Sequence, residues 1–492
     1  MEEDYIKLIF GLKLKQIRTE KNLSLFGLSK LTGLSKSYLN EIEKGKKYPK
    51  TDKIALLSEK LDVPYDDLVS LKLDKNLAPV GKILQSNILR EIPLELFGIK
   101  ENDLIAIISN APARVNAFIS TVIEIAKNYN FSRESFYLAS LRSYQEANNN
   151  YFEHLETAVI KFSESYQIDL TKPVHSAELE EILIEEYKYT INNKDLEKHS
   201  ELDNLRSVFV PASRTLLLAD HIDEAQRTFI YAKEIAYNYL GLEERLYTFS
   251  WIKFDNFDQV LHNFYASYFA GALVLPRPLL VQQLTSFFEK PVFDTKLFTD
   301  IIASHNASPE TFYQRLTNLL PKDFNIQNLF FLRFTYKKGS ENFYLNKELH
   351  LTHQHSPHAN QTNQHYCRRW ISLKVLQQIA QEEGSHILDA QISQYPDDNQ
   401  SYVVFSSATK DPFKKDQYRS ISIGMLVNKQ LSRKLSFLKD SGIKTQQVGV
   451  TCERCTITNC DVRKAPATVL QAKAKNRKIE EVVQNIFKNY GK

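Results

Sequence analysis

The sequence predicts a multidomain fold that is mostly α-helical, with α+β parts towards the C-terminal end. At 492 residues the chain is longer than one hydrophobic core usually supports, which suggests about three to four domains. Apolar residues recur at helical spacing in the first part of the chain, and strand-like segments alternate from residue 328. We therefore expect domains over residues 1–72, 73–164, 165–320 and 321–492.

The composition indicates a soluble globular protein. Hydrophobic residues make up 43% and charged residues 25%, and 14 glycines and 16 prolines leave little room for long disordered linkers. No apolar run reaches the roughly 20 residues of a membrane span, and the start Met1-Glu2-Glu3-Asp4 is acidic where a signal peptide is basic. We expect a cytoplasmic protein with no membrane partner. Its net charge of +4 is mild, so nucleic acid would have to bind a local basic patch.

The first domain is expected to contain five short helices. Ser24 and Ser35 are placed to cap two of them, with a tight turn at Gly33 between. Such a pair is a helix-turn-helix, whose second helix fits the DNA major groove. The residues expected on the inner faces are Leu8, Ile9, Leu12, Ile17, Leu28, Leu31, Leu39 and Ile42, with Gly45 ending the third helix, Thr51 capping a fourth through Lys60, and Pro64 starting a fifth.

Residues 8–71 resemble a Cro/repressor-type domain, the five-helix lambda-repressor-like form. The resemblance implies that the second helix of the pair reads bases and that a rim of lysines contacts phosphates. Leu25 departs from the pattern, because a glutamine usually stands there. The alternative is a small helical interaction module with solvated lysines. The residues implied to contact DNA are Ser35, Lys36, Ser37, Tyr38, Asn40, Glu41, Lys46 and Lys47, within a rim that also includes Lys30, Lys44, Lys50 and Lys53.

The middle of the chain begins with a linker rich in turn residues at 77–100. Amphipathic helices follow over residues 101–164, with a break at Asn148-Asn149-Asn150. They serve either as plain core or as a dimerisation helix pair. No Gly-rich phosphate loop occurs in the sequence, so a nucleotide-hydrolysing enzyme has no visible machinery.

Residues 205–276 resemble the zinc peptidase-like domain named ImmA/IrrE. Two short strands precede a helix in the position of H-E-x-x-H, and the later match includes Phe269, Ala270, Leu273 and Pro276. Lys233 and Tyr237 replace the two histidines, Glu234 alone remains, and Asn263 and Tyr265 occupy the third-ligand region. Because a lysine would repel a metal dication, we expect a degenerate zincin-like domain without catalysis. Glu234 would then be a polar residue paired with Lys233 or Arg227.

The C-terminal domain is predicted to be an α+β effector sensor with a cysteine cluster. Strand-like segments surround a helix at residues 372–384. Cys452, Cys455 and Cys460 form C-x2-C-x4-C, and with Cys367 they make four thiols that suit zinc or a four-iron cluster. The alternative is four unligated cysteines. Five histidines compete as the fourth ligand: His350, His353, His355, His358 and His365.

The order of these parts, ending in G-V-x-C-x-x-C-x-x-x-x-C, resembles the short-chain fatty acyl transcriptional regulators over most of the chain. This resemblance implies a one-component regulator that binds an operator and senses an acyl-coenzyme A or a related metabolite. Arg368, Arg369 and Trp370 are candidates for the effector's phosphates and adenine ring, or else a surface pair beside a core aromatic. We expect a homodimer or higher homo-oligomer.

Two other functions remain open at this stage. One is an ImmA/IrrE-type metallopeptidase, which bound zinc at the Lys233–Tyr237 helix would indicate. The other is an antitoxin-like module that binds a partner protein and uses DNA binding for autoregulation.

Overall fold

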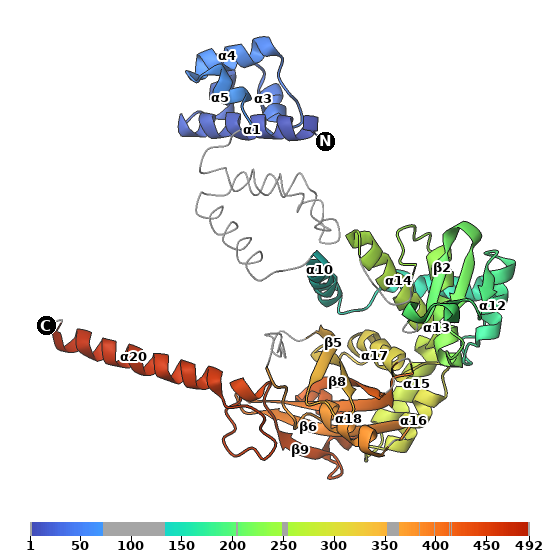
Figure 1. Cartoon of the computed structure of the whole chain (residues 1–492). Helices are drawn as coiled ribbons and strands as arrows, with labels where there is room; N and C mark the ends of the chain where they lie inside the picture. Colours follow the sequence, from blue (N-terminus) through green and yellow to red (C-terminus); the bar gives the residue numbers. More distant parts are fainter. Residues whose placement is uncertain are drawn as a thin grey trace. The chain divides into compact units, whose positions relative to one another are not determined.

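A computed structural model describes most of the chain in two compact units, residues 1–144 and 145–492 (Figure 1). The predicted linker at 77–100 and the predicted helices at 101–132 lie outside the described residues, so these predictions stay untested. The described residues are 2–71, 133–202, 205–247, 254–351, 364–382, 384–397, 399–412, 414 and 416–490.

The N-terminal domain contains the five predicted helices. The side chains of Ser24 and Ser35 cap α2 and α3, accepting hydrogen bonds from the N–H groups of Gly27 and Tyr38. Two details differ from prediction: Thr51 is the first residue of α4 rather than its cap, and Leu31 is exposed rather than inward-facing. The helices are α1 (Glu2–Glu20), α2 (Leu25–Thr32), α3 (Lys36–Glu43), α4 (Thr51–Leu61) and α5 (Tyr65–Val69).

Helix α3 is fixed against α1 by close backbone contact and an ion pair. A Cβ atom at Gly11 would lie 2.2 Å from the carbonyl oxygen of Ile42, so only glycine permits this crossing. Arg18 of α1 donates to both carboxylate oxygens of Glu43 at 2.6 and 3.0 Å, and this interaction raises the Arg18 pKa. The helix predicted to face DNA is therefore held at a defined angle.

A three-stranded sheet and its helices lie in the second unit, and α10 spans the boundary between the units. The strand order is β1-β3-β2, with β1 parallel and β2 antiparallel to β3. Asn149 and Asn150 adopt left-handed φ angles at the predicted break after α10. The elements are α10 (Arg133–Ala147), α11 (Glu153–Tyr166), α12 (Ser176–Glu185), β1 (Thr190–Asn192), β2 (Ser207–Val210), β3 (Thr215–Leu218), α13 (Glu224–Tyr239) and α14 (Phe257–Val274).

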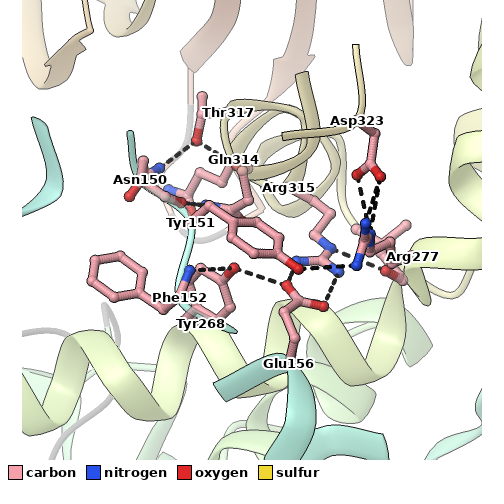
Figure 2. Close-up of polar contacts among 12 residues, drawn as sticks. Asn150, Tyr151, Phe152, Glu156, Tyr268, Arg277, Gln314, Arg315, Thr317 and Asp323 are labelled. Atoms are coloured by element: carbon pink, nitrogen blue, oxygen red, sulfur yellow. Dashed lines mark hydrogen bonds and ion pairs between the residues drawn. The ribbon is translucent and has the colours of Figure 1, made fainter. Parts of the chain in front are cut away.

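Helices α15 (Arg277–Phe288), α16 (Thr295–Ala303) and α17 (Pro309–Asp323) lead into the C-terminal sheet. Figure 2 shows how α17 is tied to the segment after α10. Arg315 donates to both oxygens of Glu156 at 2.5 and 2.9 Å, and Asn150 donates to Thr317 at 2.7 Å. The guanidinium of Arg277 pairs with Asp323 at 2.7 Å. The Arg315–Glu156 and Asn150–Thr317 contacts are buried and join residues 159 and 167 positions apart, whereas Arg277 and Asp323 are 46 apart.

The C-terminal sheet has six strands in the order β5-β4-β8-β7-β6-β9. Helix α18 (Ile371–Glu382) packs on one face, and α17 contacts β4 and β8 from the other. Gly424 lies opposite Phe330, whose ring occupies the space of a Cβ atom. The strands are β4 (Leu329–Lys337), β5 (Phe343–His350), β6 (His386–Tyr395), β7 (Gln400–Lys410), β8 (Gln417–Leu426) and β9 (Lys444–Gln447), and α19 (Lys429–Lys434) and α20 (Thr468–Tyr490) follow β8 and β9.

No single helix in the described ranges is long and apolar enough to cross a membrane. Helices α14 and α15 meet that criterion only when taken together, across a bend of 66°.

Candidate nucleic-acid interface and effector-domain sites

The outer face of α3 presents the residues predicted to contact bases. Ser35, Lys36 and Ser37 are exposed at its start, while Tyr38, Asn40 and Glu41 are half-buried. The Ser35 hydroxyl accepts the Tyr38 N–H at 3.2 Å, so this residue also caps the helix. The first turn of α3 is thus accessible to a DNA groove, and its inner face is closed by Leu39 and Ile42.

The lysines after α3 provide the predicted basic rim. Lys46 and Lys47 are exposed, as are Lys44 and Lys50. The ammonium of Lys47 lies 3.6 Å from Glu41 and 5.2 Å from the Tyr38 ring centre. Glu41 therefore already has a cationic neighbour, which weakens its implied role in contacting DNA.

One exposed aromatic was missed by the sequence reasoning. Phe26 in the first turn of α2 is 57% exposed, and Lys30 lies 5.1 Å from its ring centre. Leu25, where the family pattern has glutamine, is half-buried and packs against the domain core. The large apolar ring of Phe26 on the surface of the domain is the feature that could have marked this residue as functional.

The helix in the H-E-x-x-H position carries a buried polar network instead of histidines. Lys233 of α13 donates to the Asn263 side-chain oxygen at 2.7 Å, and the Tyr237 hydroxyl reaches the same oxygen at 3.4 Å. Burial lowers the Lys233 pKa to about 8. The fold thus brings Asn263, from the region expected to hold a third ligand, directly to the lysine ammonium.

Glu234 pairs with a residue that local spacing did not indicate. Its carboxylate accepts from Arg245 at 2.6 Å and from the Tyr189 hydroxyl at 3.0 Å. Of the predicted partners, Lys233 and Arg227 each donate to an asparagine, and Lys233 also interacts electrostatically with Glu234. The Arg245 guanidinium also lies between the rings of Phe209 and Tyr237, at 4.1 and 4.3 Å.

This network leaves a small recess lined by polar and apolar side chains. Lys233 and Glu234 each have an internal partner, although the buried Nε of Arg245 has none among the described residues. A metal dication would meet the Lys233 ammonium at the position of the first peptidase histidine. The lining residues are Ser207, Ile230, Lys233, Glu234, Tyr237, Leu246 and Tyr247.

The backbone brings Cys367 to the cysteine loop, which we define as residues 449–464. The Cys367 N–H donates to the Val450 carbonyl at 3.1 Å, and the Cys452 N–H donates to the His365 carbonyl at 2.8 Å. Burial raises the pKa of the Cys367 thiol, which also interacts electrostatically with Cys455. A Cβ at Gly449 would lie 2.7 Å from the Cys455 sulfur, so glycine allows this close approach.

Donor groups around the cysteine loop suit thiolate ligands. The N–H groups of Gly449 and Lys464 point at the sulfurs of Cys367 and Cys452, each at 3.4 Å. Arg463 clamps the loop by donating to carbonyls, including those of Cys452 at 2.7 Å and Ile457 at 2.6 Å. Within the described residues, no three His, Cys, Asp or Glu side chains already form a metal-binding group. Cys367 interacts electrostatically with Cys452 and Cys455, and Cys455 with Cys460, and thiols are ligands that suit zinc or iron.

Of the histidines named as competing ligands, one lies at the cysteine loop and one lies on β5. His365 contacts Glu453 at 2.8 Å through Nδ1, and His350 is buried beside Glu348 on β5. His353, His355 and His358 lie outside the described residues.

The predicted effector residues have internal partners. Arg368 donates to the Glu341 carbonyl and stacks 4.3 Å from the Phe343 ring centre. Arg369 pairs with Asp461 at 3.0 Å, beside the cysteine loop, and Trp370 is buried in the sheet core. These contacts favour the alternative in which Trp370 is a core aromatic, although Arg368 is buried rather than on the surface.

Comparison with known proteins supports the assignment of the N-terminal domain. A helix-turn-helix family model matches residues 14–68. Among solved structures, the chain is similar to a Mycobacterium tuberculosis transcriptional regulator at 17% identity and a TM-score of 0.47, over 66% of this chain and 92% of the other. Curated protein sequences give no significant match. The family match assigns residues 14–68 to a helix-turn-helix domain.

Proposed function

We propose that this protein is a sequence-specific, one-component transcriptional regulator that responds to a short-chain acyl-coenzyme A or a related metabolite in the cytoplasm. The observation that carries the proposal is the exposed first turn of α3, within the domain matched by the helix-turn-helix family. Lys36 would read a guanine edge, and Lys46 and Lys47 would contact phosphates. The rest of the chain would convert metabolite binding into a change at the operator.

The test uses DNA sites selected from a random pool by the full-length protein. Lys36→Ala is expected to reduce the preference for a selected site over scrambled DNA about tenfold, since one base contact is lost. Lys47→Ala should weaken binding to both DNAs alike. The slope of the logarithm of affinity against the logarithm of salt concentration should fall by about one, as expected for one lost phosphate contact. Lys60→Ala, an exposed lysine of α4 paired with Glu59, is the matched control. An unchanged preference in Lys36→Ala would refute base reading by α3.

A homodimer is supported by the C-terminal helix. Helix α20 extends away from the sheet (Figure 1), and its exposed apolar residues recur at the spacing of a helix–helix seam. A second copy of the chain would cover this stripe of apolar side chains. It would also supply a second α3 helix for a second DNA half-site. Ile479→Glu should shift the sedimentation of the protein to the monomer, whereas Glu480→Gln should not. The stripe consists of Ile479, Val482, Val483 and Ile486.

The contacts of helix α17 support the proposal that the chain responds to an effector. Arg315 and Thr317 tie it to residues 150–156, which follow α10 along the chain. A ligand that moved α17 would therefore act on the chain segment that leads back towards the helix-turn-helix. This tie is the physical basis for coupling in the proposed regulator.

A metal at the cysteine loop is also part of the proposal, as zinc or a four-iron cluster held by Cys367, Cys452, Cys455 and Cys460. Zinc would staple the loop to the sheet, and a cluster would add redox sensitivity. Elemental analysis and absorbance of anaerobically purified protein, with Cys367→Ser and Cys455→Ser, distinguish the two. Metal that survives both substitutions would exclude this site.

The peptidase-like resemblance of residues 205–276 enters the proposal as a sensory body without catalysis. The Lys233–Asn263 contact supports this view, because an ammonium fills the first ligand position. Zinc bound at α13, or proteolysis abolished by Glu234→Gln, would instead favour a metallopeptidase.

A further inference from the structure

The α17 face of the C-terminal sheet carries cations on three adjacent strands. Side chains alternate along a strand, so register decides which of them share a face. Arg333 of β4 lies opposite Lys347 of β5, and Thr335 of β4 lies opposite Arg419 of β8. Arg333, Lys347 and Arg419 therefore share the face opposite to that of α18.

These cations converge on one carboxylate in the first turn of α17. Oε1 of Glu310 accepts from Lys347 at 2.7 Å and from Arg333 at 3.0 Å, and Oε2 lies 3.8 Å from Arg419. Arg419 also lies 4.0 Å from Asp411. The cations hold the pKa of Glu310 far below its usual range despite its burial.

A fourth cation, Arg206 at the start of β2, belongs to the same cluster. Its pKa is lowered to about 10, first by burial and then by the charge of Arg419. Lys233 of α13 is within electrostatic reach, since Lys347 and Arg206 both help to lower its pKa. We refer to Arg206, Arg333, Lys347 and Arg419 as the cationic cluster.

The cationic cluster has more positive than negative charge among the residues that the structure describes. Its four cations face two carboxylates, Glu310 and Asp411. Like charges directly opposite on neighbouring strands destabilise a sheet, and Arg333 and Lys347 are such a pair. The Nε atom of Arg333 is buried and has no hydrogen-bond partner in the described structure. Fold stability alone does not explain this arrangement.

Part of the cluster is accessible from solvent. The Lys347 side chain is 49% exposed and that of Arg333 is 20% exposed. Neighbouring protein nevertheless lowers the Lys347 pKa, chiefly by desolvation. Partial exposure with desolvation is expected on the wall of a recess, where an anion gains strong electrostatic attraction and still has an entry path.

We propose that the cationic cluster binds a ligand that carries two or more phosphate charges. Guanidinium groups match phosphate oxygens in paired hydrogen bonds, and the Lys347 ammonium adds a point charge. Cations on three adjacent strands span about 10 Å, which suits a diphosphate better than a single small anion. The N-terminus of α17 adds favourable dipole potential at the same place. This inference rests on the proposed function, because it gives the chemistry by which the effector would bind.

The test is calorimetric titration of the full-length protein with inorganic pyrophosphate and with coenzyme A. Both are expected to bind wild type, and Lys347→Gln and Arg333→Gln should each weaken binding at least tenfold, as for a lost charge-assisted hydrogen bond. Lys337→Gln removes an exposed lysine of the same strand β4 and should leave affinity unchanged. Circular dichroism confirms that each variant is folded.

A second control separates this site from the DNA-binding surface, because a basic rim also attracts phosphate. The double variant Lys36→Ala/Lys47→Ala should bind pyrophosphate as wild type does. If it loses anion binding while Lys347→Gln retains it, the cationic cluster is not the site and the inference is overturned.

The remaining outcomes distinguish the inference from the proposed function. Coenzyme A binding that is equal in wild type, Lys347→Gln and Arg333→Gln overturns the inference and leaves the proposed effector intact. Pyrophosphate binding that depends on the cluster, with no binding of coenzyme A, upholds the site and removes that effector class. Absence of binding by both anions overturns the inference.

Discussion

Helix α17 places charged side chains in two contrasting settings. Arg315 is 1% exposed and meets one buried carboxylate, that of Glu156, in two short hydrogen bonds. Glu310, at the start of the same helix, faces three cations and remains partly exposed. The first setting is balanced and closed, as expected for a structural tie. The second has excess positive charge and access to solvent, as expected where a counter-charge arrives from outside.

The largest effect should come from breaking the balanced pair. Arg315→Met leaves the Glu156 carboxylate buried without its cation, which should lower the free energy of unfolding by about 3–5 kcal/mol. Urea unfolding at pH 7 measures this loss. The double variant Glu156→Gln/Arg315→Met should recover much of the stability, since no uncompensated charge remains. A single variant that loses less than about 1 kcal/mol would show that the pair is not the tie we describe.

Lys233 extends the comparison to a buried cation that is partnered by an amide. Its folded-state pKa of about 8 lies below the ordinary value of 10.5, so the unfolded chain binds the proton more tightly. Stability should therefore rise with pH between about 8 and 10.5, by at most about 3 kcal/mol. Lys233→Met should lack this contribution. Thermal unfolding of both proteins between pH 7 and pH 10 gives the difference, and parallel curves would contradict it.

Glu310→Gln tests the second setting, in which the carboxylate at the start of α17 faces three cations. Without the carboxylate, Arg333, Lys347 and Arg419 repel one another, and stability should fall by about 1–2 kcal/mol at low salt. Because the pKa of Glu310 is far below its usual range, wild type should keep this stabilisation as pH falls until the carboxylate is protonated. Added pyrophosphate should restore stability to Glu310→Gln but not to Glu156→Gln, as measured by thermal unfolding. Equal responses of the two variants would remove the distinction between the settings.

The smallest effect is expected at the exposed pair of the same helix. Lys322 lies 3.2 Å from Glu153, and both side chains are largely in solvent. Lys322→Ala should change the free energy of unfolding by less than about 1 kcal/mol, with a contribution from the nearby Tyr151 ring. A loss as large as that of Arg315→Met, in the same urea titration, would mean that burial does not control the strength of these ties.

The helix-turn-helix was predictable because its signals are local. The caps Ser24 and Ser35, the turn at Gly33 and the apolar spacing all lie within about twenty residues of one another. Strands β4, β5, β7 and β8 were likewise visible as apolar runs. Strand β6 was missed, since the buried polar residues Gln391 and Ser393 interrupt its hydrophobic pattern.

The long-range polar partners could not be predicted in the same way. Arg245 and Tyr189 reach Glu234 from opposite directions along the chain, so no spacing rule connects them. The cationic cluster depends on strand register, which the sequence does not display. One signal was available: Arg333 and Arg419 each interrupt an otherwise apolar strand, and a charge there requires a partner or a function.

The Lys233–Asn263 contact has a practical consequence for how the protein responds to its surroundings. The amino group at this point of α13 is part of a side chain, so a chelator cannot extract it and another metal cannot replace it. The polar core that it completes should therefore assemble equally well under metal starvation and metal excess. If the cysteine loop holds a metal as proposed, a chelator should disturb that loop and leave the described polar core around Lys233 intact.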